Sequence, residues 1–188
     1  GALSGRRMNG SENTILFIVF VFSGALMTLH AWQAAGIFAA TSFGYYIWTT
    51  QCIPVAGGSI WRNVQSRNTH APILNVAFVQ AYIWAVVGAI NLAAVGEAGV
   101  DGTIHLWVLG WISTLVIGIS SQMMRALTGA VPISERTIIV LLWLWQIVAL
   151  QRGLGRTIGS GPTVAILLAL ITWGVLLLWS GSLLTAVS

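Results

Sequence analysis

Charged residues are scarce in this chain, and lysine is missing altogether. Only 6% of the 188 residues are charged, whereas an ordinary soluble domain has about a quarter. The absence of lysine excludes any chemistry that needs a lysine Schiff base, including the binding of retinal. The single cysteine, Cys52, excludes an intrachain disulfide and a thiolate metal cluster, and it is interpreted as a small buried apolar residue.

Acidic residues are absent from the interiors of the apolar segments. Glu12, Glu97, Asp101 and Glu135 all lie near segment ends or in connections. A proton-coupled pump needs a carboxylate inside the membrane, so this distribution disfavours one. The segments also offer no nucleophile–base pair and so predict no self-contained catalytic centre, which leaves the question of enzymatic activity open, with a redox role as one candidate.

The basic residues do not form a nucleic-acid surface. All eight are arginines, they give a net charge of +4, and they are scattered among the short connections. This pattern is typical of topology signals at the membrane surface, and no nucleic-acid partner is expected.

What fills the chain is apolar sequence, with 57% of the residues hydrophobic. Six runs are each long enough to cross a bilayer, and in hydrocarbon only a helix satisfies the backbone of such a run. The sequence therefore predicts an all-α integral membrane bundle of six transmembrane helices. The predicted spans are 13–31, 34–53, 72–94, 103–125, 133–151 and 163–186.

The domain organisation is equally simple. Residues 1–12 are expected to form an N-terminal tail, of which Gly1 to Arg7 resemble a cloning remnant ahead of Met8. Residues 13–188 are expected to form one six-helix transmembrane domain. The connection near His30 is the shortest of those between the predicted spans, and its length predicts a very tight turn between the first two spans.

Arginine counting predicts the orientation. With both termini in the cytoplasm, the inner connections carry four arginines against two outside, leaving aside the first seven residues. The inner four are Arg62, Arg67, Arg125 and Arg136, and the outer two are Arg152 and Arg156. The predicted location is a prokaryotic cytoplasmic membrane, with the lipid bilayer as the principal partner.

Two of the three histidines fall at a matched depth. His30 ends the first predicted span and His105 begins the fourth, on the same side of the membrane, whereas His70 lies on the other side. Two neutral imidazoles on different helices are the arrangement that ligates a haem iron from both faces. The alternative is that each histidine is interfacial and binds nothing.

The fourth span has two distinct faces. Ile112, Val116 and Ile119 lie within about 40° of the His105 direction, and they form an apolar face for lipid or an apolar ligand such as a porphyrin. Gly110, Thr114, Gly118 and Ser121 lie on the opposite side. Small residues in that pattern predict close packing against another helix.

A polar stripe runs along the third span. Gln80, Trp84 and Asn91 share one direction, and uncharged amides in a membrane need partners, so this stripe is expected to face the bundle. Gln122 and Gln146 are interpreted in the same way. Hydrogen bonding between helices is the favoured role, and support of a cofactor is the alternative.

Residues 105–129 contain a motif. It begins with His105, continues with Leu109-Gly110, Thr114 and Gly118, and ends with Arg125 and Gly129. This pattern resembles the small haem–copper oxidase subunit I-like membrane proteins, and the resemblance implies haem b bound through His105.

This chain departs from the family pattern in two ways. Gln122 stands where relatives often have a second histidine, and the proline before the arginine is absent. The chain also lacks the three further histidines that a copper ion beside the haem would need, so no copper centre is expected.

Together these features predict a membrane-embedded, cytochrome-like protein that binds b-type haem through His105, with His30 as the second iron ligand. Ile112, Val116 and Ile119 would contact the porphyrin. The predicted role is electron transfer or haem or gas sensing, with partner subunits or a second copy. The alternative is a cofactor-free membrane protein, either a structural subunit of a larger complex or a small transporter.

Overall fold

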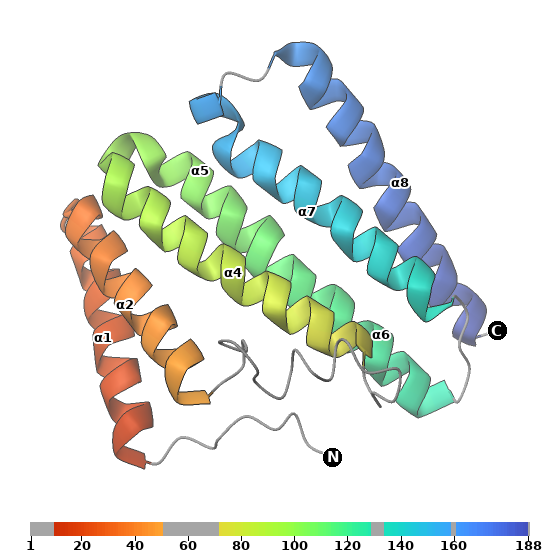
Figure 1. The fold of residues 1–188 in the computed structure, drawn as a ribbon, viewed down its shortest axis with the longest axis horizontal. Helices are drawn as coiled ribbons and strands as arrows, with labels where there is room; N and C mark the ends of the chain where they lie inside the picture. The colour runs from red at the N-terminus through yellow and green to blue at the C-terminus, as the bar shows by residue number, and fades with distance from the viewer. Residues whose placement is uncertain (1–9, 51–71, 129–133, 159–160, 188) are drawn as a thin grey trace.

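The protein is an all-helical bundle in a computed structural model that describes residues 10–50, 72–128, 134–158 and 161–187 (Figure 1). No strand occurs in those residues, which confirms the predicted helical class. The helices are α1 (Gly10–Thr28), α2 (Trp32–Thr50), α4 (Pro72–Val95), η1 (Gly96–Gly99), α5 (Val100–His105), η2 (Leu106–Ser113), α6 (Thr114–Thr128), α7 (Glu135–Ile158) and α8 (Pro162–Val187).

Helices α1 and α2 form an antiparallel hairpin with the tight turn that the sequence predicts. The backbone of His30 has a φ of 57°, in the left-handed region, and its N–H donates to Met27 O at 3.1 Å. Ser23 Oγ donates to Ala35 O at 2.8 Å and joins the two helices. Helix α1 begins at Gly10, so residues 10–12 belong to it rather than to the predicted tail.

The centre of the bundle is formed by α4, the continuous segment α5–η2–α6, and α7. Its core includes Ile73, Ala77, Ile117, Leu142 and Trp145, all buried. Helix α2 packs on one side of α4, whereas α8 packs on α7 and α6 at the opposite side of the bundle (Figure 1).

The small face of the fourth span packs as predicted. Thr114 and Ser121 are buried. A Cβ added at Gly110 would clash with Trp84 of α4, and one at Gly118 would clash with Ala77. The glycines thus allow α4 to lie directly against η2 and α6, which is the close helix approach that small residues permit in membranes.

The prediction of six transmembrane helices is met only in part. By length and apolarity, three stretches of the described chain can cross a membrane: Gly10–Thr28, Val76–Met123 and Glu135–Gly155. The second of these includes both α4 and α5–η2–α6, which run in opposite directions on either side of η1. Helix α8 adds a shorter apolar stretch, Ile166–Gly181. Helix α2 is less apolar because it carries glutamine, serine, threonine and tyrosine side chains.

Candidate functional site

His105 is held in an orientation that leaves one ring nitrogen available. Its Nδ1 lies 2.8 Å from the carbonyl oxygen of Asp101, one helical turn earlier, and 3.7 Å from Asp101 Oδ1. Both neighbours are acceptors, so the proton belongs on Nδ1 and the lone pair on Nε2. A backbone carbonyl on the far nitrogen is the usual way in which a metal-binding histidine is oriented.

The apolar face predicted beside His105 is exposed. Ile112, Val116 and Ile119 are all exposed, and the His105 side chain is 38% exposed. We call these four residues the His105 stripe. The stripe therefore presents an apolar surface and one imidazole nitrogen on the outside of the bundle.

A π-helix follows His105 directly. Segment η2 has the wider π-helical turn over Leu106–Ser113, and Ser113 Oγ donates to Val108 O, five residues earlier, at 2.7 Å. Trp145 of α7 donates through Nε1 to Leu109 O at 2.8 Å. Segments of π-helix within α-helices are frequently found at functional sites. Nothing in the sequence signals this one.

His30 lies at the same end of the bundle as His105. Its side chain is exposed, and its ring meets that of Trp32 edge-on, with centroids 5.4 Å apart. The start of α2 adjoins η1, because a Cβ at Gly96 would lie 3.3 Å from Gln33 Cγ. Figure 1 shows the α1–α2 turn beside the η1 turn.

The side of η2 that faces α2 differs from the side that carries the His105 stripe. The side of η2 that meets α2 carries Trp111, whose ring centroid is 4.9 Å from that of Phe43. The His105 stripe is a different, exposed side of the same segment. The third histidine, His70, lies outside the described residues. Among those residues, no group of three or more His, Cys, Asp or Glu side chains could hold a metal ion.

The polar stripe of the third span faces the bundle, as predicted. Gln80 is 5% exposed and Gln146 of α7 is 8% exposed. Trp84 donates through Nε1 to Gln146 Oε1, while Gln146 Nε2 lies 3.1 Å from Gln80 Oε1 and 3.3 Å from Thr114 Oγ1. We call Gln80, Trp84, Thr114 and Gln146 the amide network. It joins three separate helices through side chains alone.

The other amides differ from one another. Asn91 Nδ2 donates to Gly99 O at 3.0 Å and to Thr103 Oγ1 at 3.1 Å, which ties the end of α4 to η1 and α5. Gln122 is half-buried, and its Oε1 is enclosed with no hydrogen-bond partner among the described residues.

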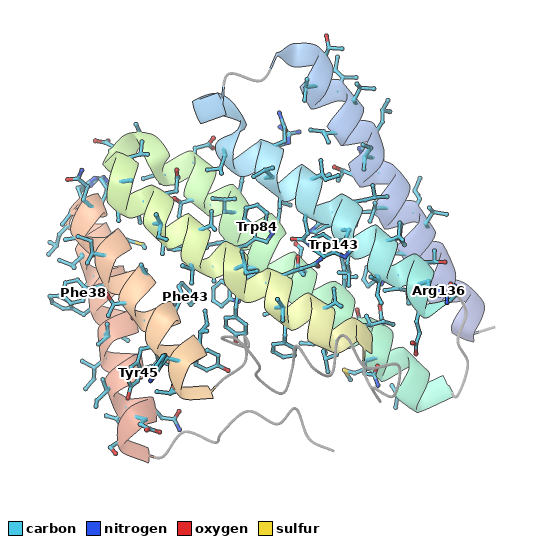
Figure 2. The ribbon with its side chains drawn as sticks, viewed as in Figure 1. Phe38, Phe43, Tyr45, Trp84, Arg136 and Trp143 are labelled. Atoms are coloured by element: carbon cyan, nitrogen blue, oxygen red, sulfur yellow. The ribbon has the colours of Figure 1, made fainter. Side chains whose placement is uncertain are left out.

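A groove lies between α4 and α7 beside the amide network. Its volume is about 270 Å³, and its lining residues come from these two helices. Figure 2 labels Trp84 on α4 and Trp143 on α7. The lining residues are Val76, Val79, Gln80, Ile83, Trp84, Trp143 and Gln146. Sequence reasoning missed Trp143, although its spacing of three residues from Gln146 places both on one side of α7.

Comparison of this chain with protein-family models, curated proteins and solved structures gives no match. The resemblance of residues 105–129 to the oxidase-like membrane proteins therefore stays a prediction from that motif.

Proposed function

We propose that this chain is an integral membrane protein that binds b-type haem through His105 and serves in electron transfer or in haem or gas sensing. The orientation of His105 carries the proposal: Asp101 O holds Nδ1, which leaves Nε2 as an iron ligand beside an exposed apolar stripe.

The proposed topology is six antiparallel crossings with both termini in the cytoplasm of a prokaryotic cell. The crossings are α1, α2, α4, the segment α5–η2–α6, α7 and α8. The helices of 19–26 residues correspond to about 28–39 Å, which matches a hydrocarbon core of about 30 Å with some tilt. The distribution of side chains supports this topology, because the Gln80 and Gln146 amides lie inside the bundle and large apolar residues cover its outside.

The residues of the His105 stripe have different roles at the proposed site. His105 would bind iron, and Ile112, Val116 and Ile119 would contact the porphyrin and keep water away from it. Bound haem supplies one-electron exchange at iron and, where a coordination position is open, gas binding. The carbonyl of Asp101 fixes the ring orientation, and the carboxylate of the same residue lies 3.7 Å from Nδ1.

His30 is the proposed second ligand, and fewer observations support this assignment than support that of His105. It rests on the position of the α1–α2 turn at the same end of the bundle as α5. Because the stripe is exposed, a second copy or a partner subunit is the other source of that ligand.

The proposal is tested by expressing the wild type, His105→Ala, His30→Ala and His70→Ala with added haem precursor and measuring haem per purified chain. We expect His105→Ala to lose the haem and His70→Ala to keep it. We expect His30→Ala to keep haem but to change from a low-spin to a high-spin spectrum. Loss of haem in the His70 variant alone would show that the ligand assignment is wrong.

The same stripe also supports the alternative, a cofactor-free subunit of a larger membrane complex, because exposed apolar side chains can pack against another helix. In that case the purified chain would be colourless and would co-purify stoichiometrically with other subunits. A small transporter would instead show stabilisation by its substrate.

A further inference from the structure

The groove between α4 and α7 is apolar and opens on the outside of the bundle. Ile83 of α4 and Trp143 of α7 both line it and are exposed. Gln80 and Gln146 also line it, but their amides bond to each other, and no polar atom of the described lining residues is exposed in the groove. We call this feature the α4–α7 groove. Its surface suits an apolar occupant, because a polar group placed there would find no partner.

One arginine lies on the same side of α7 as the groove. Arg136 is seven residues before Trp143, which places the two residues within about 20° of each other around the helix. Figure 2 labels both on α7. Val140 is exposed between them, whereas Glu135 lies about 100° around the helix from Arg136. Arg136 is exposed, and no ion pair between described residues includes it. A positive charge therefore lies at the end of the apolar surface that leads into the groove.

The distance from Arg136 to the far part of the groove equals the depth of one lipid leaflet. Arg136 is the second residue of α7, and Gln146 lies about 15 Å further along the helix axis. On α4 the lining begins at Val76, about 6 Å from the start of that helix. Figure 1 shows the starts of α4 and α7 at the same end of the bundle. Half of a hydrocarbon core about 30 Å thick is also about 15 Å.

This arrangement matches the two parts of a phospholipid. With α7 crossing the membrane as proposed, Arg136 lies at the level of the headgroups, and the groove extends over the depth of an acyl chain. A guanidinium group pairs with phosphate through two parallel hydrogen bonds. A lipid of net negative charge suits Arg136 better than a zwitterionic lipid, because no ammonium group then offsets the attraction.

We infer that the α4–α7 groove holds one acyl chain of an anionic diacyl phospholipid whose phosphate pairs with Arg136. The acyl chain packs against Ile83 and Trp143, and the lipid belongs to the leaflet in which α4 and α7 begin. This site depends on the proposed crossing of α7 but not on haem, so it stands whether or not His105 binds iron.

The test uses the full chain, purified in detergent, stripped of lipid and titrated with dioleoyl phosphatidylglycerol or dioleoyl phosphatidylcholine. Native mass spectrometry counts the lipids bound to each chain. We expect one phosphatidylglycerol to bind more tightly than any further lipid. We expect Arg136→Gln to weaken this binding about fivefold, the effect of one arginine near the membrane surface on an anionic lipid, and to abolish the preference over phosphatidylcholine.

The matched control for the charge is Arg152→Gln. Arg152 is also an exposed arginine of α7, but it lies about 24 Å further along the helix and about 160° around it from Arg136. We expect the Kd of the tight site in this variant to stay within about twofold of wild type.

A second pair of variants tests the acyl chain instead of the charge. Ile83 and Ile90 are 46% and 54% exposed on the same side of α4, seven residues apart, but of the two only Ile83 lines the groove. The larger side chain of Ile83→Trp occupies space in the groove, and we expect it to weaken the tight site at least about fivefold. Ile90→Trp makes the same change outside the groove, and we expect the Kd to stay within about twofold of wild type.

Three results would overturn the inference. Equal binding of both lipids that Arg136→Gln leaves unchanged would show that the groove accepts any acyl chain. The lack of a site tighter than the rest would show that lipid only surrounds the bundle. A lipid-free dimer that Ile83→Trp dissociates would show that a second copy covers the groove.

The haem proposal is judged separately from the lipid site. We expect His105→Ala to bind phosphatidylglycerol as the wild type does. A chain that lacks haem but keeps the tight lipid would contradict only the haem proposal, and a haem-containing chain without the tight lipid would contradict only the lipid site.

Discussion

Helices α1 and α7 are both apolar enough to cross a membrane, yet they relate to the rest of the protein in opposite ways. Only 6% of the apolar stretch of α1 is buried, against 50% of that of α7. The buried residue of α1 is a serine, Ser23, which bonds to α2. Helix α7 buries Gln146, whose amide contacts two other helices.

The difference shows what each kind of residue specifies in this chain. The apolar content of a helix predicts whether it lies in water or in lipid, and this content is similar for α1 and α7. The positions of polar and small residues predict which face of a helix packs against protein. Lipid cannot form the hydrogen bonds that an amide needs, and large side chains keep two helix backbones apart. The following substitutions sharpen that comparison.

The largest effect is expected at a glycine between central helices. A Cβ at Gly102 of α5 would clash with the backbone oxygen of Gly153 in α7, whereas one at Gly24 of α1 would meet nothing within 4 Å. We expect Gly102→Ala to lower the free energy of unfolding by about 2–3 kcal/mol. Gly24→Ala should leave it unchanged or raise it by up to about 1 kcal/mol. Unfolding in mixed detergent micelles measures both, and equal effects would remove the distinction between the two helices.

A smaller effect is expected at the centre of the amide network. Gln146→Leu leaves the Trp84 N–H and the Gln80 oxygen without their described partner, and we expect a loss of about 1–2 kcal/mol. Thr41→Val is the control, because the exposed Thr41 hydroxyl bonds only within its own helix, to Ile37 O at 2.8 Å. The same unfolding assay applies, and a neutral Gln146→Leu would mean that the network does not join the helices.

The smallest effect is expected on the outside of α1. Ile18 is exposed, so in a bilayer its side chain touches lipid in both the folded and the separated state. We expect Ile18→Ala to change stability by less than about 0.5 kcal/mol. A loss of about 2 kcal/mol or more would show that this face of α1 is covered by protein.

Much of the fold was predictable, because membrane helices follow from runs of apolar residues and their ends from glycine and proline. The tight turn at His30 was predicted from the short connection between two spans and is confirmed. The packing role of Gly110 and Gly118 and the inward direction of Gln80 were predicted from periodicity and are also confirmed. Each depends on residues within a single helix or turn.

What escaped prediction depends on which helices are neighbours. The π-helix accepts a hydrogen bond from Trp145, which lies on another helix, and no local sequence pattern predicts this π-helix. The groove between α4 and α7 is lined by Trp84 and Trp143, which come from separate helices. The pairing of His30 with His105 also depends on two helices, and it stays a prediction, because a matched depth in the sequence fixes only the end of the bundle at which each residue lies.

The central claim is that His105 holds haem in the membrane, and an absorbance spectrum of the wild-type chain tests it most directly. The protein is purified from membranes of cells supplied with haem precursor, and its spectrum is recorded before and after reduction with dithionite. We predict a Soret band that shifts on reduction, with iron bound stoichiometrically to the chain. A colourless, iron-free protein that is otherwise folded would contradict the claim.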